Sequence, residues 1–462
     1  MIQTLVIFGA SGDLTSRFLI PAIARLHQTG KLPEGLRVLG VARDDWNTHR
    51  FRSHLEQKLD WSGTADVSGL RETILGKVDY CRADVTSRDQ LARALGKLTD
   101  PLVAYLALPP GLFAPSIESL AALRMPKGSK VVLEKPFGES LESAQALNHL
   151  LHESFPERDV FRLDHFLGKQ TVQNILGLRF ANRIFEPVWN THHIDRVEII
   201  WDETITAAGR ASFYDGTGAL RDMVQNHLLQ LLALIAMEPL HALDERTLRD
   251  HKVAVLRAVR RLTPDEVLGQ TVRGRYSRGA IGNEEILPYL QEEGVRAERN
   301  TETFAQVTLS IDNWRWTGVP FLLRTGKALG RDRREIVIHF KPVPHLAFGQ
   351  EAQPIPNVLV IELDPNRIAL KVNVNEPGDL FNLEQLELDT RLQSGALPAY
   401  ARLLLDVLDG DPTLSIRDDE AEESWRIVEP ILQAWGGGGV PVVDYPAGSG
   451  GPYGDLNCDA SR

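Results

Sequence analysis

Cysteine is scarce in this sequence, which has only Cys81 and Cys458 among its 462 residues. Two cysteines so far apart exclude a disulfide-rich scaffold and are typical of a protein from a reducing compartment. Residues 1–8 also lack the cationic segment that precedes the apolar run of a secretory signal. We therefore expect no signal peptide and a cytoplasmic location.

Long hydrophobic runs and excess positive charge are missing too. The longest apolar stretch, Leu228–Met237, is interrupted by Gln230 and is half of the roughly 20 residues that cross a bilayer. The 51 Lys and Arg residues against 62 Asp and Glu residues give a formal net charge of −11. Nucleic acids and anionic membranes are bound by cationic surfaces, so neither is expected as a partner. An anionic ligand would need a local cluster of cations.

What is present is the composition of a globular protein, with 43% hydrophobic and 24% charged residues in a chain long enough for two or three domains. Up to about residue 165, short apolar runs alternate with helical patterns, which predicts a doubly wound parallel sheet. Beyond that point strands follow one another, which predicts a mostly antiparallel sheet in an α+β domain. The predicted domains are 1–165 and 166–462. The first five predicted strands are Leu5–Phe8, Arg37–Ala42, Val78–Tyr80, Leu102–Leu108 and Lys130–Leu133.

A glycine-rich turn joins the first predicted strand to the first helix. Gly9 and Gly12 form a GxxG pattern, in which the backbone can approach a pyrophosphate at the helix N-terminus. The pattern falls short of GxGxxG, and an ordinary strand-to-helix turn is the alternative. The second strand ends at Arg43, which favours the 2′-phosphate of NADP over a solvated strand-end charge. Asp44 and Asp45 follow at once and would weaken that site, so use of NAD stays open.

Polar residues near the predicted domain junction suggest an anion site. If a helix starts at about Asp164, His165 and Lys169 share one helical face and could bind a phosphate. The alternative is a helix cap by Asp164 with a solvated lysine. Lys135 closes the fifth strand, at the sheet edge where ligands of open α/β folds bind.

A second polar cluster ends in His227, at the mouth of a predicted helix that spans Leu220–Met237 and must be buried. Its polar side chains predict a lined cleft, against the alternative of a histidine satisfied in the core. The pair His192 and His193 invites a metal, but adjacent strand side chains diverge and no matching ligands are spaced around them, so no metal is expected.

Taken together and in order, several segments of this chain resemble the glucose-6-phosphate dehydrogenase family. They are GASGDLTSRFLIPA, YLALPP, EKPFG, RLDHFLGKQTVQN, RFANRIFEPVWN, FYDGTGALRDMVQNHLLQ, TETFAQVTL, GVPFLLRTGKAL and YARLLLDVLDGD, and they cover nearly the whole chain. The resemblance implies a Rossmann-like coenzyme domain, a larger α+β domain, and assembly into homodimers or homotetramers. It further implies oxidation of glucose 6-phosphate at C1 to the 6-phosphogluconolactone, the first oxidative step of the pentose phosphate pathway, with hydride passing to NADP.

The resemblance also implies roles for individual residues. His227 would be the general base that takes the C1 hydroxyl proton, and Asp164 would orient it and stabilise the imidazolium. No metal is required. His165 and Lys169 would bind the substrate phosphate; Lys135, Glu203, Asp222 and Lys327 would hold the sugar; Gly9, Ser11, Gly12, Arg43 and Lys135 would hold the dinucleotide.

The chain departs from the family pattern near these positions. Phe166 stands where Tyr is usual, Phe18 replaces a common Lys, and Asp332 falls where relatives often carry Arg. We therefore expect activity without assuming the usual substrate affinity, and a second, structural NADP site stays open. Asp364 and Gly450 are further departures, at positions that are commonly Gln and Trp.

Two alternatives to an active glucose-6-phosphate dehydrogenase stay open. One is a catalytically silent relative that reports redox state to a partner, and the other is an oxidoreductase for another sugar or polyol.

Overall fold

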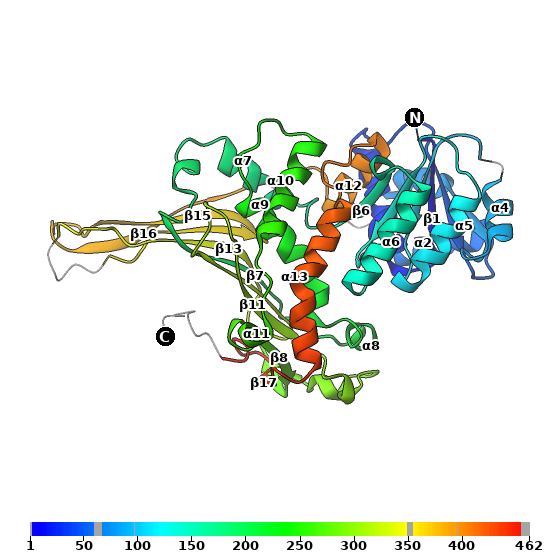
Figure 1. Cartoon of the computed structure of the whole chain (residues 1–462). Coiled ribbons are helices and arrows are strands. Elements are labelled where there is room, and N and C mark those ends of the chain that lie inside the picture. The colour runs from blue at the N-terminus through cyan, green and yellow to red at the C-terminus, as the bar shows by residue number, and fades with distance from the viewer. Residues whose placement is uncertain (1, 60–66, 97, 349–353, 394, 454–462) are drawn as a thin grey trace. The chain divides into compact units, whose positions relative to one another are not determined.

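A computed structural model describes residues 2–59, 67–96, 98–348, 354–393 and 395–453 (Figure 1). Cys458 lies outside these residues. The chain forms two compact units: unit 1 is Met1–Gln170, His241–Asp250 and Gly395–Glu422, and unit 2 is Thr171–Leu240, His251–Ser394 and Glu423–Arg462. The division into domains 1–165 and 166–462 stays a prediction. Among the described helices, none has the length and apolar character needed to cross a membrane.

Unit 1 is built on a six-stranded parallel sheet with the strand order β3-β2-β1-β4-β5-β6. The order reverses between β1 and β4, and ligands of such sheets bind beyond the carboxyl ends of the strands at this point. The predicted Rossmann-like sheet is confirmed. Its strands are β1 (Thr4–Phe8), β2 (Arg37–Ala42), β3 (Val78–Arg82), β4 (Leu102–Leu106), β5 (Lys130–Glu134) and β6 (Val160–Leu163).

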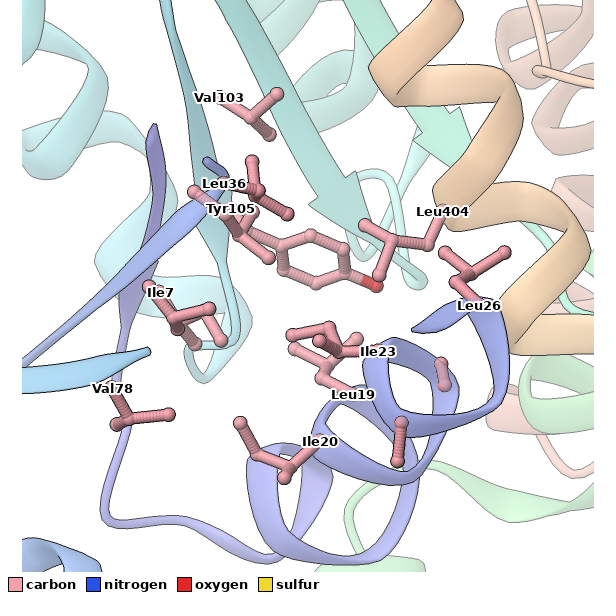
Figure 2. Close-up of a cluster of buried hydrophobic side chains, with 14 of the residues drawn as sticks. Ile7, Leu19, Ile20, Ile23, Leu26, Leu36, Val78, Val103, Tyr105 and Leu404 are labelled. Carbon is pink, nitrogen blue, oxygen red and sulfur yellow. The ribbon is translucent and has the colours of Figure 1, made fainter. Parts of the chain in front are cut away.

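A hydrophobic core covers one face of this sheet. The ring of Tyr105 is fully buried among aliphatic side chains that include Leu19, Ile23 and Leu404 (Figure 2). Leu404 belongs to α12 (Ala399–Asp409), which joins unit 1 although it lies near the end of the chain. The other helices of this unit are α1 (Ile20–Gln28), α2 (Thr48–Lys58), α3 (Val67–Gly76), α4 (Arg88–Leu95), α5 (Phe113–Ala122) and α6 (Leu141–Ser154).

Unit 2 is built on a nine-stranded sheet with the order β16-β15-β14-β13-β7-β12-β11-β8-β17. Every neighbouring pair is antiparallel except β7 with β12 and β8 with β17, which confirms the predicted mostly antiparallel sheet. The β15–β16 hairpin is visibly elongated in Figure 1. The strands are β7 (Ile194–Asp202), β8 (Thr271–Ser277), β11 (Phe304–Ser310), β12 (Pro320–Gly326), β13 (Arg333–Phe340), β14 (Val358–Leu363), β15 (Asn366–Asn375), β16 (Leu383–Arg391) and β17 (Val442–Pro446), with a separate hairpin of β9 (Gly279–Ile281) and β10 (Glu284–Ile286).

The long helix predicted from Leu220 is present in unit 2 but is not a uniform α-helix. It begins as a π-helical segment, η5 (Leu220–Leu228), and continues as α9 (Leu229–Ala236), in which every residue is buried. Burial follows from the apolar side chains that surround this helix on all sides. The remaining helices are α7 (Gln170–Phe180), α8 (Ala211–Tyr214), α10 (Glu245–Ala258), α11 (Pro264–Gln270) and α13 (Asp418–Gly436).

The prediction that a helix starts at about Asp164 is wrong, because α7 begins only at Gln170. Residues 165–169 form a turn instead, in which the Asp164 carboxylate accepts the Phe166 N–H at 2.9 Å. Gly168 indicates why: a Cβ there would lie 2.6 Å from the carbonyl oxygen of Ala399, so the turn backbone packs directly on α12. His165 and Lys169 are therefore placed by a packed turn and not by a helical face.

Candidate functional site

The glycine turn after β1 is closed tightly between the ends of two neighbouring strands. Gly9 has a φ of +77°, and its N–H donates to the Val41 carbonyl of β2 at 2.9 Å. A Cβ on Gly9 would lie 2.2 Å from the carbonyl oxygen of Ala107, just past β4, so only glycine fits. The Gly12 N–H then donates to the Gly9 carbonyl at 3.0 Å. Such a turn before a helix is how dinucleotide-binding folds hold a pyrophosphate.

Arg43 lies directly after β2, at the same edge of the sheet. It is exposed and forms no ion pair or hydrogen bond with any other described residue. Asp45, which could compete with a bound phosphate, is paired with Arg82 at 2.8 Å. The main-chain carbonyl of Asp44 accepts the Tyr80 hydroxyl at 2.9 Å. At least one of the two acids that follow Arg43 is thus neutralised, which favours an anion beside Arg43.

A hydrogen bond links the carboxyl ends of β4 and β5, where the Tyr105 hydroxyl donates to the Glu134 carboxylate. The hydroxyl is held rigidly because the ring is locked in the core (Figure 2). Burial raises the pKa of Glu134 to about 7; the hydrogen bond from Tyr105 opposes this rise, and the nearby charge of Asp164 adds to it. Lys135 follows directly, at the sheet edge, as predicted. Tyr105 and Glu134 each lie in a sequence motif. Their hydrogen bond could not be predicted, because it depends on β4 and β5 lying side by side.

Glu134 should make the stability of the ligand-free protein depend on pH. Its pKa is raised from 4.5 to about 7, so folding disfavours the ionised form, and its contribution to stability falls as pH rises from about 4.5 to 7. Glu134→Gln removes this charge and can still accept the Tyr105 hydrogen bond. We expect it to raise the free energy of unfolding by about 3 kcal/mol at about pH 8 and by far less at about pH 4. Urea unfolding at both pH values measures this, with the exposed Glu118→Gln of α5 as the control. An equal effect of Glu134→Gln at both values would contradict it.

The predicted phosphate residues of unit 1 lie on aromatic surfaces. The His165 ring stacks on Tyr400 of α12 with 5.7 Å between centroids and 9° between planes. The Lys169 ammonium lies 4.7 Å from the centroid of the Phe166 ring. Tyr400 also packs against Phe18, with 4.9 Å between the two ring centroids. Stacking and cation–π attraction hold both candidate cations in defined places. Sequence reasoning assigned no role to Tyr400, although it opens one of the motifs.

His227 lies in the π-helical segment η5 and is 1% exposed. π-Helical turns re-aim side chains relative to an α-helix and occur often at functional sites. The start of this segment is anchored by the buried Glu302, whose carboxylate accepts the Leu220 N–H at 3.0 Å. Gly218 is needed there, because its φ is +73° and a Cβ would lie 2.4 Å from that carboxylate. The histidine is therefore a buried imidazole on a firmly held segment.

Three further predicted residues gather around Tyr214 within unit 2. The Lys327 ammonium lies 2.8 Å from a Glu203 carboxylate oxygen and 5.3 Å from the centroid of the Tyr214 ring. Glu203 follows β7 and Lys327 follows β12, and these parallel neighbours end at the same edge of the sheet. Burial, followed by the charge of Asp222, raises the pKa of Tyr214 well above its usual range. Asp222 is therefore close to the same tyrosine.

The predicted site residues thus fall into two groups by unit. Those of unit 1 are Gly9, Ser11, Gly12, Arg43, Lys135, Asp164, His165 and Lys169, and those of unit 2 are Glu203, Asp222, His227 and Lys327.

Two other polar features receive no ligand here. In unit 1, His152 lies 2.8 Å from Asp418 and 3.4 Å from Glu157, but Glu157 is already paired with the buried Arg162 at 2.7 Å. In unit 2, a cavity of about 530 Å³ is lined by charged side chains that pair with one another across the sheet. We assign neither a metal nor a ligand to them.

Known proteins resemble this chain over nearly its whole length. Residues 6–174 match the family described as glucose-6-phosphate dehydrogenase, NAD binding domain, and residues 176–458 match its C-terminal domain. Glucose-6-phosphate 1-dehydrogenase of Zymomonas mobilis is 39% identical, over 98% of this chain and 96% of that protein. The corresponding protein of Treponema pallidum is 42% identical, over 97% and 92%.

Two solved structures have the same fold. A glucose-6-phosphate dehydrogenase in complex with its substrate glucose 6-phosphate is 33% identical with a TM-score of 0.87, over 96% of this chain and 94% of that chain. Glucose-6-phosphate 1-dehydrogenase from Mycobacterium avium is 35% identical with a TM-score of 0.85, over 98% and 96%.

Proposed function

Because this chain belongs to the glucose-6-phosphate dehydrogenase family, we propose that its own His227 and Asp164 carry out the proton transfer of the family's reaction. The protein is an NADP-dependent oxidoreductase that converts glucose 6-phosphate to 6-phospho-D-glucono-1,5-lactone. In this oxidation the C1 hydroxyl loses its proton and C1 loses a hydride. NADP, when bound, accepts the hydride, so the protein must supply the base.

His227 is the proposed base. A neutral imidazole accepts the C1 hydroxyl proton, and the carboxylate of Asp164 keeps the ring oriented and stabilises the imidazolium that forms. The observation that carries this proposal is the burial of both groups, with His227 1% exposed and Asp164 fully buried. Buried titratable side chains are costly unless they serve one another or a ligand. On this reading the proton is held at an imidazole nitrogen of His227 while the hydride departs.

We propose that cations and polar side chains of this chain bind the substrate. We assign the 6-phosphate to the imidazole of His165 and the ammonium of Lys169, each of which lies against an aromatic ring. Phosphate needs such a cluster because the net charge of the chain is −11. The residues assigned to the sugar are Lys135, Glu203, Asp222 and Lys327.

We assign the dinucleotide to the glycine turn and to Arg43. The closed turn fits a pyrophosphate, and the exposed guanidinium fits a 2′-phosphate, which NADP carries and NAD lacks. The preference for NADP over NAD then depends on the contact of Arg43 with the 2′-phosphate. The residues of this proposed site are Gly9, Ser11, Gly12, Arg43 and Lys135.

Arg43→Ala should separate the two cofactors. We expect kcat/KM for NADP to fall about 50-fold, because a charge-assisted bond to the 2′-phosphate is lost, whereas kcat/KM for NAD should change by less than about threefold. Steady-state rates with each cofactor at saturating glucose 6-phosphate measure this. Arg37→Ala is the matched control, because Arg37 is an exposed arginine at the opposite end of β2. Equal losses with NADP and NAD would remove Arg43 from the 2′-phosphate site.

We further propose a homodimer or homotetramer that works in the cytoplasm. Exposed apolar side chains on the β15–β16 hairpin support self-association, since Leu380, Phe381 and Leu388 are 69%, 67% and 59% exposed. Leu380 and Phe381 are neighbours in the loop of this hairpin, and adjacent exposed apolar side chains are typical of a protein interface. The scarcity of cysteine supports a reducing compartment. Light scattering of the purified protein measures the mass of the assembly, which distinguishes a monomer, a homodimer and a homotetramer.

A further inference from the structure

Arg334 is held in an unusual place for an arginine. It lies on β13 directly opposite Trp201 of β7, with its guanidinium carbon 5.3 Å from the centre of the indole ring. Two carboxylates hold it over the ring: Asp332, 3.2 Å from one terminal nitrogen, and Asp364, which bonds to the other. Asp332 and Asp364 thus both engage Arg334 through its terminal nitrogens. With two carboxylates attached, the guanidinium is already neutralised and is poorly suited to bind an anionic substrate.

Two routes of contact lead from Arg334 to Glu203. On the first, Trp201 lies under the guanidinium and donates its indole N–H to one Glu203 oxygen at 3.3 Å. On the second, Asp332 holds the guanidinium with one oxygen and accepts the Thr204 N–H with the other at 2.7 Å. The first route holds the Glu203 carboxylate and the second holds the backbone directly after it. Arg334 therefore fixes Glu203 from two sides.

The carboxylate that is held in this way faces a lysine. One Glu203 oxygen takes the indole N–H, and the other lies 2.8 Å from the ammonium of Lys327. The Trp201 residue is 5% exposed, and the side chains of Glu203 and Lys327 are 16% and 14% exposed, so protein contacts rather than water set their directions. Holding binding groups in one orientation before the substrate arrives removes an entropy cost from binding.

We propose that Arg334 is a positioning residue, which acts through Trp201 and Asp332 to orient the Glu203 carboxylate and its partner Lys327 for the sugar of glucose 6-phosphate. This inference rests on the proposed sugar-binding role of Glu203 and Lys327. Arg334 itself touches neither the substrate nor the cofactor in this account.

Arg334→Ala in the full-length enzyme tests the proposal by steady-state kinetics at saturating NADP. We expect KM for glucose 6-phosphate to rise about tenfold with kcat within about twofold, because a group that orients substrate binding is lost and the base is untouched. Arg334→Lys should rescue KM only in part, since an ammonium cannot reproduce the planar contact with two carboxylates and the ring. Asp364→Asn, which leaves the indole packing in place, should raise KM about threefold and carries the test if Arg334→Ala does not fold.

Arg367→Ala is the matched control. Arg367 on β15 is also held by several carboxylates, those of Glu362, Glu387 and Asp389, so the same charge is removed from the same sheet. Its ion pairs are with acids of β14 and β16, and none leads to Glu203. KM for glucose 6-phosphate should therefore stay at the wild-type value.

Glu203→Ala separates this inference from the proposed site. If Arg334 acts through Glu203, then Glu203→Ala raises KM at least as much, and adding Arg334→Ala raises it no further. KM increases that multiply in the double variant would overturn the positioning role, as would an unchanged KM in Arg334→Ala beside an impaired Glu203→Ala. An unchanged KM in Glu203→Ala would overturn the sugar-binding role of Glu203, and the positioning role with it.

Discussion

Replacing His227 with asparagine should lower kcat for glucose 6-phosphate oxidation by about 10³-fold while KM changes by less than about threefold. Asparagine is polar and fits a buried site, but it cannot take a proton from the C1 hydroxyl. The lost interaction is used in the transition state, so substrate binding should survive. We expect a large effect because His227 is the histidine of η5, is buried, and is the proposed base.

Initial rates of NADPH formation over a range of glucose 6-phosphate give both constants, and calorimetric titration shows that the variant still binds substrate. His193→Asn is the control, since it makes the same change at an exposed histidine. Asp164→Asn should lower kcat less than His227→Asn, because the carboxylate acts through the base. A wild-type kcat in His227→Asn would show that another group is the base.

Lys169→Ala should have the opposite signature, with KM for glucose 6-phosphate raised about 100-fold and kcat within about threefold. The ammonium of Lys169 is held against the Phe166 ring by a turn that packs on α12. It is assigned to the 6-phosphate, which does not react, so its contact is equally strong in the ground state and in the transition state. Losing it should therefore weaken binding without slowing the chemical step.

The same steady-state assay measures this, with unphosphorylated glucose as a second substrate. Lys169→Arg should recover most of the affinity, and Lys127→Ala, a change at an exposed lysine of unit 1, should leave KM unchanged. With glucose, wild type and Lys169→Ala should have the same kcat/KM, because there is no phosphate to bind. An equal loss with glucose and with glucose 6-phosphate would contradict the assignment.

Local sequence patterns predicted both sheets. The strand Arg37–Ala42 has the predicted bounds, and the change from alternating helices and strands to consecutive strands marks two differently built sheets. Such patterns record which side chains are buried along one element. They do not record which distant segments pack together, so nothing in the sequence placed α12 beside the core that contains Tyr105. The same limit explains the wrong helix start at Asp164, where contact with Ala399 accompanies a turn.

In the candidate site, too, local motifs could be predicted from the sequence and contacts between strands could not. Motifs pointed to Gly9 and His227, because a glycine turn and a polar cluster beside an apolar helix are visible along the chain. The Glu134–Tyr105 hydrogen bond and the contact of Arg334 with Trp201 were missed, since each joins residues from neighbouring strands. Their partners are set by strand register, which follows from the three-dimensional pairing.

The most direct test of this account is the steady-state rate of NADPH formation by the wild-type protein, with glucose 6-phosphate and glucose compared side by side. We predict saturable turnover of glucose 6-phosphate, with kcat/KM exceeding that for glucose by about 10³-fold, because charge-assisted contacts to the phosphate are together worth several kcal/mol. Absence of turnover at millimolar glucose 6-phosphate in a protein that binds NADPH tightly, or equal kcat/KM for the two sugars, would contradict it.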